Sequence, residues 1–264
     1  MKKYLVVGNP IEHSKSPLIH NYWMKKNNIN AHYDKKLLKE NEIESLIQDL
    51  RKDKIYGVNV TVPFKKFIIP FLDKLSDEAT TTQSVNTIYK TENKIIGDNT
   101  DIEGFQISLE KTNHIIKDKI VFILGAGGVV PSIIVALEKM GVSKIYVSNR
   151  TELKTLELKN IFSKIEIIKW GETTDFDIMI NATSIGLDKN EEIILDYAKV
   201  SKNKFFYDVI YNPKQTNFLI NAKKFGAKIE NGKMMFLYQA QKAFFLWHGI
   251  MPEVDSETIK LMDR

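Results

Sequence analysis

The chain has 264 residues, of which 43% are hydrophobic, and it contains no cysteine, so disulfides, thiolate catalysis and cysteine-bound metals are excluded. Its net charge is +5 at pH 7, but the lysines are scattered and arginine is scarce, which favours anionic small molecules over nucleic acid as partners. No apolar run reaches the length of a membrane span, and the start "MKKYLVVGNP" lacks the long apolar region of a signal peptide, so we expect a cytoplasmic protein.

The first hundred residues alternate short apolar runs with amphipathic segments. This alternation predicts parallel α/β architecture. We expect helices over residues 17–27 and 41–52, and strands over 4–8, 31–38, 56–62 and the end of 77–89.

Polar residues interrupt the ends of these segments. Ser16 precedes Pro17 and is explained by helix capping, whereas Ser14 is not, so the two hydroxyls are candidates to hold a carboxylate. Asn59 and Thr61 share one face of an apolar strand. Their polar groups would be buried there, so we expect them to contact a ligand or each other.

Three further polar residues follow in the same half of the chain. We expect Lys65 at the head of a helix, where the positive helix end would favour proton transfer, although it is otherwise one of many surface lysines. Asn86 lies in a strand-like run. Asp101 begins a helix, where its carboxylate is either an N-cap or a functional group. Strand ends that carry such residues are where α/β proteins gather ligands.

Beyond residue 100 the alternation of strands and helices continues without a Ser/Pro-rich linker. It predicts a doubly wound sheet from about 118 to 210, followed by an apolar helix and a closing amphipathic helix. We expect helices over 101–112, 130–141, 152–162, 215–226, 234–249 and 252–262, and strands within 118–124, 143–150, 165–170, 175–183 and 204–213.

A glycine loop follows the first strand of this second part. Gly125, Gly127 and Gly128 in "FILGAGG" lie between a strand and a helix, which is the setting of a dinucleotide-binding turn, although an ordinary tight turn has the same pattern. The third small position of the motif is Val130, which is bulky enough to push the helix away from the sheet, and Pro131 follows it.

The next strand bears on the choice of cofactor. About 20 residues after the glycines, where NAD-binding proteins carry an acid for the ribose 2′-hydroxyl, the chain reads "VSNR". Arg150 stands there, with Lys154 one helical turn later, and a guanidinium matches the geometry of a 2′-phosphate. The sequence therefore predicts NADP, the alternative being a solvated surface arginine.

Nine short motifs in order then point to a family. "HSKSPLIHN", "NVTVPFK", "VNT", "GDNTD", "GAGG", "NRT", "NATSIGL", "YDVIYNP" and "QAQKAFFLWHG" resemble the shikimate dehydrogenases over about residues 5–250. The resemblance implies an α/β fold of two domains: a substrate domain over 1–101, completed by helices over 235–264, and a doubly wound Rossmann NADP domain over 102–234.

The same resemblance implies roles for individual residues. Lys65 and Asp101 would be the catalytic pair. The residues expected to bind substrate, with the carboxylate at the two serines, are Ser14, Ser16, Asn59, Thr61, Asn86, Tyr211 and Gln239. The residues expected to bind NADP are Gly125, Ala126, Gly127, Gly128, Asn149, Arg150, Thr151, Lys154, Thr183 and Gly232.

The implied activity is the NADP-dependent, reversible reduction of 3-dehydroshikimate to shikimate in aromatic amino acid biosynthesis, without a metal, by a monomer or homodimer that binds neither nucleic acid nor membrane. Two departures stand out: "VVPSI" after the glycines, and Phe64 where a histidine is frequent. Two alternatives stay open. One is a quinate/shikimate dehydrogenase that uses NAD or both cofactors; the other is a non-catalytic regulator that binds NADP or shikimate.

Overall fold

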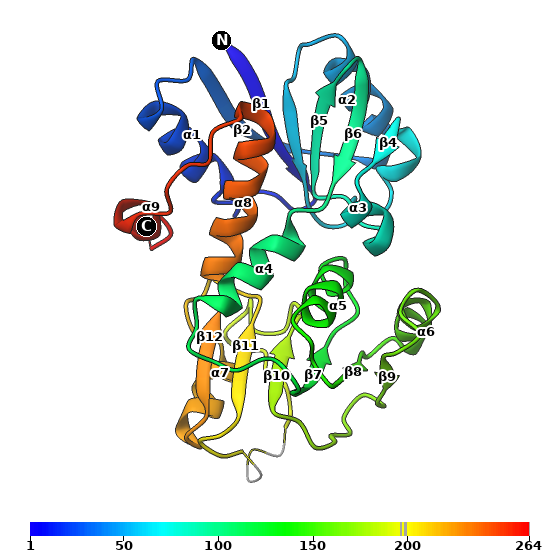
Figure 1. Ribbon diagram of the computed structural model, residues 1–264, viewed down its shortest axis with the longest axis vertical. Helices are drawn as coiled ribbons and strands as arrows, with labels where there is room; N and C mark the ends of the chain where they lie inside the picture. Colours follow the sequence, from blue (N-terminus) through cyan, green and yellow to red (C-terminus); the bar gives the residue numbers. More distant parts are fainter. Residues whose placement is uncertain (196, 198–199, 264) are drawn as a thin grey trace. The chain divides into compact units, whose positions relative to one another are not determined.

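The computed structural model describes residues 1–195, 197 and 200–263, and its chain divides into two compact units (Figure 1). We call Met1–Phe105 with Phe236–Arg264 the split unit, and Gln106–Met235 the continuous unit. Both boundaries fall inside helices, α4 (Asp101–Glu110) and α8 (Lys233–His248). The functional domain limits predicted from the sequence, 101/102 and 234/235, stay predictions.

The split unit contains a mixed six-stranded sheet in the order β2-β1-β3-β5-β6-β4. Strand β5 runs antiparallel to β3 and to β6, while β1 is parallel to both of its neighbours. The strands are β1 (Lys2–Gly8), β2 (Ala31–Leu37), β3 (Gly57–Val60), β4 (Lys74–Leu75), β5 (Thr87–Thr91) and β6 (Lys94–Asp98). The helices lying wholly in this unit are α1 (Ser16–Lys26), α2 (Ile43–Arg51), α3 (Asp77–Thr82) and α9 (Ser256–Leu261), with 3-10 turns η1 (Glu40–Glu42) and η2 (Ile69–Phe71).

Two apolar layers cover this sheet. Helix α2 buries Ile43, Leu46, Ile47 and Leu50, the i, i+3, i+4, i+7 stripe of an amphipathic helix, in a core that includes Val58 and Ile88 of the sheet. A second layer is aromatic: His20 and Trp23 of α1 contact Phe244 of α8.

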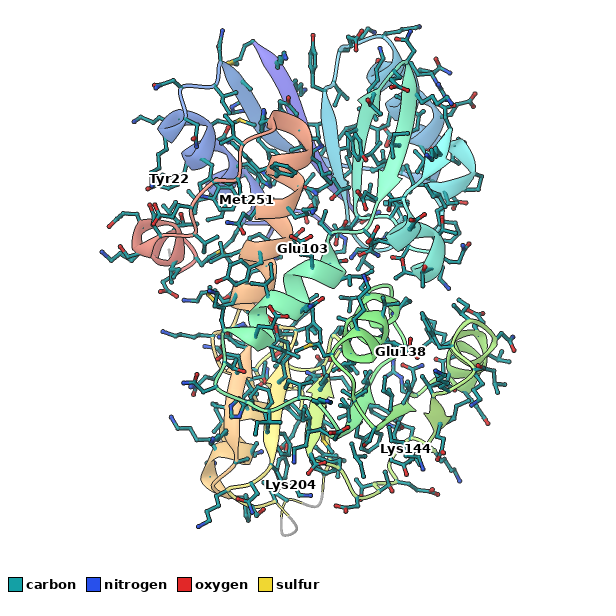
Figure 2. All side chains as sticks on the ribbon, in the orientation of Figure 1. Tyr22, Glu103, Glu138, Lys144, Lys204 and Met251 are labelled. Atoms are coloured by element: carbon teal, nitrogen blue, oxygen red, sulfur yellow. The ribbon has the colours of Figure 1, made fainter. Side chains whose placement is uncertain are left out.

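The end of the chain packs on α1. The carboxylate of Asp255 accepts hydrogen bonds from Lys26 at 2.6 Å and from Tyr22, on α1 in Figure 2, at 3.3 Å. The buried indole of Trp23 donates to Thr258 at 3.2 Å. These contacts hold the two pieces of the split unit together.

The continuous unit contains a six-stranded parallel sheet in the order β12-β11-β10-β7-β8-β9. This order is doubly wound, because β8 and β9 extend the sheet on one side of its first strand, β7, and the three later strands extend it on the other side. Its strands are β7 (Ile120–Leu124), β8 (Lys144–Ser148), β9 (Glu166–Ile167), β10 (Ile178–Asn181), β11 (Phe205–Asp208) and β12 (Lys228–Asn231). The helices wholly inside it are α5 (Val130–Lys139), α6 (Glu152–Ile161) and α7 (Asn217–Lys224). The predicted fold class, α/β with a doubly wound sheet beside a second α/β unit, is confirmed.

Two details of the predicted fold are wrong. The first sheet is mixed rather than parallel, because β5 runs antiparallel to β3 and to β6, a strand that the sequence pattern did not reveal. Lys65 is not at the head of a helix: residues 62–68 form successive turns that end at η2. Pro70 disfavours helical geometry in Ile69, the residue before it, so the turns that follow Pro63 end at η2 instead of continuing as an α-helix.

Among the residues that the structure describes, no helix is both long and apolar enough to cross a membrane.

Candidate active site

A buried ion pair occupies the split unit where two motifs of the sequence meet in space. The ammonium of Lys65 contacts the Oδ2 atom of Asp101 at 2.5 Å, and the side chains are only 11% and 9% exposed. Asp101 is the first residue of α4, where a helix favours a negative charge, and its backbone N–H donates to Asn99. Among the described contacts its carboxylate pairs with Lys65 rather than capping the helix.

Polar side chains from three parts of the sequence form one network in the same unit. Asn86 donates from Nδ2 to Thr100 at 3.0 Å and to Gln239 of α8 at 3.5 Å, and its Oδ1 accepts the Thr100 backbone N–H at 2.8 Å. Asn59 donates from Nδ2 to the Asn86 carbonyl and to Thr87, each at 3.1 Å. The structure therefore brings together Asn59, Asn86 and Gln239, which the sequence proposed as ligands.

The two serines lie at the start of α1. Ser14 Oγ accepts the backbone N–H of Ser16 and donates to Ser16 Oγ, both at 3.3 Å. The expectation that Ser16 caps the helix is wrong: Ser16 is the first residue of α1, and Lys15 is its N-cap, without a side-chain capping bond. Thr61 is half-buried just beyond β3, and its side chain forms no hydrogen bond with a residue that the structure describes.

Three buried residues of this network escaped the sequence analysis as site residues. Tyr33 donates its hydroxyl to Asn59 Oδ1 at 2.6 Å, and Thr87 and Thr100 connect to Asn86. Thr87 and Thr100 lie inside the motifs "VNT" and "GDNTD". For Tyr33 the signal was its place as an aromatic residue between polar neighbours in β2.

The glycine loop lies at the carboxyl end of β7 in the continuous unit. Gly125 has a φ of +114°, and a Cβ atom there would lie 2.7 Å from the Ala182 carbonyl oxygen, so only glycine fits. Gly127 is exposed, and a Cβ atom there would have its nearest neighbour, the Ala182 oxygen, at 4.0 Å, which leaves the backbone open to a ligand. Ala126 and Gly128 complete the loop, and α5 begins at Val130, whose side chain is buried.

Two cations stand at the carboxyl end of the neighbouring strand β8. Arg150 and Lys154 are exposed, and neither side chain pairs with a residue in the described part of the chain. Asn149 donates to the Thr151 carbonyl at 2.8 Å, and Thr151 precedes α6. An open glycine loop beside two unpaired cations fits the pyrophosphate and 2′-phosphate of NADP.

The remaining predicted residues also lie in the continuous unit. Thr183 uses its hydroxyl internally, donating to Asn181 at 2.7 Å and accepting the Ile185 N–H at 3.0 Å. Gly232 packs so tightly that a Cβ atom would lie 2.1 Å from the Val209 oxygen, so the fold itself requires glycine there. Tyr211 is half-buried after β11, in a different unit from the other proposed substrate residues.

A buried carboxylate that the sequence analysis did not single out supports these loops. Asp208, at the end of β11, accepts hydrogen bonds from Thr216 at 2.5 Å, the Ile210 N–H at 2.9 Å and Asn181 at 3.1 Å. Burial raises the pKa of this carboxyl to about 6, although the three donors oppose the rise. Asp208 thereby ties the loops after β10 and β11 to the start of α7.

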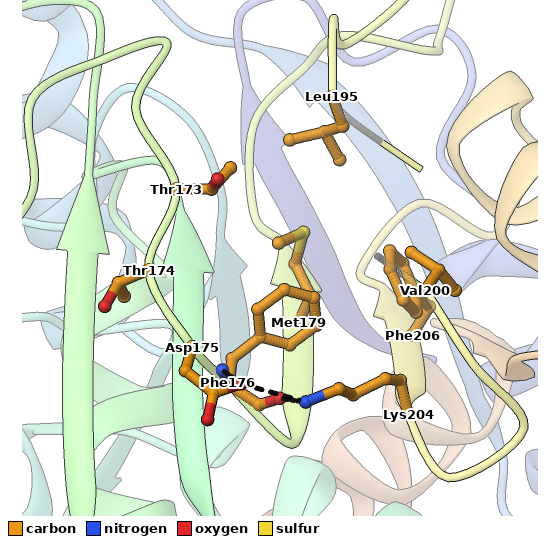
Figure 3. Close-up of a pocket in the computed structure, with 9 residues that line it drawn as sticks. All are labelled: Thr173, Thr174, Asp175, Phe176, Met179, Leu195, Val200, Lys204 and Phe206. Carbon is orange, nitrogen blue, oxygen red and sulfur yellow. Dashed lines mark hydrogen bonds and ion pairs between the residues drawn. The ribbon is translucent and has the colours of Figure 1, made fainter. Parts of the chain in front are cut away.

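A pocket of about 280 Å³ lies in the continuous unit at the amino ends of β10 and β11 (Figure 3). Its apolar floor includes Phe176 and Met179 at the start of β10, and Lys204, just before β11, donates to Asp175 on its rim. Parallel strands place the glycine loop at the other end of the sheet, so this pocket is separate from the NADP loops. None of the predicted site residues lines it.

The sequence and the fold of this chain are similar to those of known proteins. Residues 6–88 match the family described as the shikimate dehydrogenase substrate binding domain. Over 262 residues, which is 99% of both chains, the sequence is 68% identical to the shikimate dehydrogenase (NADP(+)) of Pelagibacter ubique strain HTCC1062. The chain belongs to the shikimate dehydrogenase family.

Solved members of the family share the fold. The shikimate dehydrogenase of Aquifex aeolicus has a TM-score of 0.91 at 34% identity, over 100% of this chain and 98% of its own. The enzyme of Thermus thermophilus, solved with NADP(H) and shikimate, also has a TM-score of 0.91, at 29% identity over 100% and 99% of the two chains. Membership of an NADP-dependent oxidoreductase family, expected from the nine motifs, is confirmed.

Proposed function

We propose that this protein catalyses the NADP-dependent, reversible reduction of 3-dehydroshikimate to shikimate, with Lys65 and Asp101 as the catalytic pair. The observation that carries the proposal is the buried 2.5 Å contact between Lys65 and Asp101, beside a cluster of asparagine and threonine side chains, in a member of this family. Removing two charges from water is costly, so such a pair is retained where its chemistry is used.

Proton transfer is the part of the reaction that the chain's own side chains perform. Reduction of a ketone builds negative charge on its oxygen, and the ammonium of Lys65 donates a proton there. The Asp101 carboxylate holds the Lys65 ammonium in position through their buried contact. In the oxidation of shikimate, the neutral amine of Lys65 takes the hydroxyl proton back.

Substrate recognition belongs to the remaining polar residues. Ser14 and Ser16, at the start of α1, suit the substrate carboxylate, because hydroxyl groups and free N–H groups at a helix start both donate to anions. The residues assigned to the ring hydroxyls and the carboxylate end are Asn59, Thr61, Asn86, Tyr211 and Gln239.

We assign cofactor binding to the continuous unit. NADPH, when bound, supplies the hydride. The loop Gly125–Gly128 would hold its pyrophosphate, and Asn149, Arg150, Thr151 and Lys154 its 2′-phosphate, with Thr183 and Gly232 nearby along the cofactor. The exposed, unpaired Arg150 and Lys154 support NADP over NAD.

The test is a spectrophotometric assay of NADP reduction by shikimate with wild type, Lys65→Ala and Lys66→Ala. We expect Lys65→Ala to lower kcat by at least about a hundredfold with little change in shikimate affinity, because it removes the proton donor. Lys66→Ala, which removes the exposed neighbouring lysine, should behave like wild type. Wild-type turnover by Lys65→Ala would refute the catalytic assignment.

The same assay separates the other candidates. Repeating it with quinate and with NAD distinguishes a quinate/shikimate dehydrogenase, and shikimate binding without any turnover would identify a regulator. A cytoplasmic location and a monomeric or homodimeric state stay predictions, the latter open to measurement by light scattering.

A further inference from the structure

The turn between β6 and α4 contains a buried asparagine to which the mechanism above gives no part (Figure 1). This residue, Asn99, lies inside the motif "GDNTD" and is only 2% exposed. Its Oδ1 atom accepts the backbone N–H of Asp101 at 3.1 Å, so the side chain forms a turn with the residue two positions along the chain. Asn99 therefore holds the residue at which α4 begins, which is also a member of the proposed catalytic pair.

The backbone of Asp101 depends directly on this contact. The N–H groups in the first turn of a helix have no partner within the helix, so a buried one needs an acceptor from elsewhere. Among the residues that the structure describes, Asn99 is the one that bonds the Asp101 N–H, and Lys65 is the one that bonds its carboxylate. Asn86 holds the neighbouring residue instead, through the Thr100 N–H.

The nitrogen of the same amide is bonded to the segment that holds Lys65. Asn99 Nδ2 donates to the Ser84 carbonyl at 2.9 Å and to the Thr82 hydroxyl at 3.1 Å, and both of these residues are fully buried. The residue after Ser84 is Val85, whose N–H donates to the Lys65 carbonyl at 2.9 Å. The Asn99 side chain therefore bridges the backbone segments that carry the two members of the pair.

The chemistry of the two ends of the bridge requires an amide. The Ser84 carbonyl only accepts, so it needs the Asn99 nitrogen, and the Asp101 N–H only donates, so it needs the oxygen. An aspartate would lose the donor, and a serine or alanine is too short to reach both partners. Because the amide is uncharged, it acts on the ion pair through position and not through charge.

We propose that Asn99 is a positioning residue of the catalytic pair: by bridging Ser84 and Asp101, its amide sets where Asp101 stands relative to Lys65. This inference rests on the proposed function, in which Lys65 transfers the proton. Proton transfer requires closely aligned groups, so a small displacement of Asp101 lowers turnover. Substrate and NADP binding are assigned to other residues, and the effect therefore falls on kcat.

The test compares full-length wild type with Asn99→Ala and Asn99→Ser. A serine hydroxyl can form the turn with the Asp101 N–H but does not reach Ser84, so this variant removes the bridge and keeps the turn. We expect both variants to lower kcat at least about tenfold, with the KM values for shikimate and NADP within about twofold of wild type.

Asn21→Ala is the matched control in the same unit. Asn21 also bonds a backbone N–H and a backbone carbonyl, both of Tyr33, at 2.9 and 2.7 Å. Its loss should lower stability in the same way as the loss of Asn99, but kcat should stay within about twofold of wild type, because Asn21 contacts neither Lys65 nor Asp101 in the described hydrogen bonds.

A positioning role also predicts that the loss depends on Lys65. In a Lys65→Ala background no pair remains to be aligned, so adding Asn99→Ala should change kcat by less than about twofold, because residues that act as a unit are not additive. An equal loss of kcat in the two backgrounds would show a merely structural role and overturn the proposal.

Wild-type kcat in Asn99→Ser would also overturn it, and this variant decides the matter if Asn99→Ala does not fold. A crystal structure of Asn99→Ser needs no turnover: the contact between Lys65 Nζ and Asp101 Oδ2, 2.5 Å in the wild type, should lengthen beyond about 3.5 Å, and an unchanged contact would refute the bridge. Absence of turnover in wild type would instead refute the proposed function, while this distance still decides whether Asn99 positions Asp101.

Discussion

Arg150 is the residue to which we assign the choice of NADP over NAD. It precedes α6, whose start repels a positive charge, and it has no partner among the residues that the structure describes. A phosphate at this point would satisfy both the guanidinium and the helix start. The NADP phosphate is the ligand that fits this requirement.

We expect Arg150→Asp to raise the KM for NADP about a hundredfold more than the KM for NAD. Charge-assisted hydrogen bonds to a phosphate are worth about 3 kcal/mol, or roughly a hundredfold, and an aspartate also repels the phosphate. Steady-state kinetics with both cofactors measure the ratio. Lys164→Asp, at an exposed lysine elsewhere in the continuous unit, is the charge-matched control, and equal losses for the two cofactors in Arg150→Asp would contradict the assignment.

For single residues, candidate functional groups were easier to predict from the sequence than the contacts that they make. Lys65, Asp101 and Asn86 were recognisable from motifs, and the structure places each of them in a buried polar cluster. Tyr33 was not, because its importance depends on His20 and Asn59, which are distant in sequence and meet only after folding. Spacing alone does not reveal a partner across a sheet.

Among the elements, helix α8 joins the two pieces of the split unit, as the contacts between α1 and the segment around α9 also do. Its Trp247 donates to the Ile88 carbonyl at 3.1 Å and lies directly on Gly57 of β3. A Cβ atom at position 57 would lie 2.4 Å from Trp247 Nε1, closer than any contact allows. The glycine in β3 thus makes room for the indole of α8.

Gly57→Ala should lower the free energy of unfolding by about 2 kcal/mol, because the added methyl group forces Trp247 away from β3. Chemical denaturation followed by circular dichroism measures this loss. In a Trp247→Phe background, where the smaller ring leaves space, the same substitution should cost clearly less. Identical costs in the two backgrounds would show that the indole is not the obstacle.

The elements that sequence patterns revealed are those with strong local periodicity. Strand β7 and helix α2 were evident, whereas β6 and β12 were missed because charged residues break the apolar run in each. The two-residue turn Glu92–Asn93 joins β5 to β6 with positive φ at both residues, but it lacks the glycine that marks such a hairpin in a sequence. The helix expected at Lys65 failed because Pro70 overrides local helical spacing.

For the molecule as a whole, an aromatic layer around His20 links stability to pH. His20 is 0% exposed, neither ring nitrogen has a hydrogen-bond partner in the described structure, and Tyr33, Trp23, Phe244 and Trp247 surround it. Burial, with a smaller contribution from His248, lowers the pKa of His20 to about 3. A proton therefore binds the unfolded chain, with its usual pKa of 6.5, much more readily than the folded one.

It follows that His20 contributes its full stability above pH 6.5 and loses it as the pH falls toward 3. Between pH 7.5 and 5.5 this loss amounts to about 1.4 kcal/mol. Urea unfolding at the two pH values should show a smaller difference for His20→Leu than for wild type, whereas His32→Leu, at an exposed histidine, should leave the difference unchanged. Some dependence will persist, because the pKa of His248 is also lowered, to about 4. An undiminished difference in His20→Leu would rule out His20 as the source.

The insertion of the continuous unit within the split unit also sets an order of events during synthesis. Residues 1–105 leave the ribosome before the whole continuous unit, and Gln239, Phe244 and Trp247, which complete their polar network and aromatic layer, are made after it. At ordinary translation speeds the wait is on the order of ten seconds. During that interval His20 and Trp23 lack their covering helix, so the nascent chain offers an apolar surface to chaperones until α8 has been made.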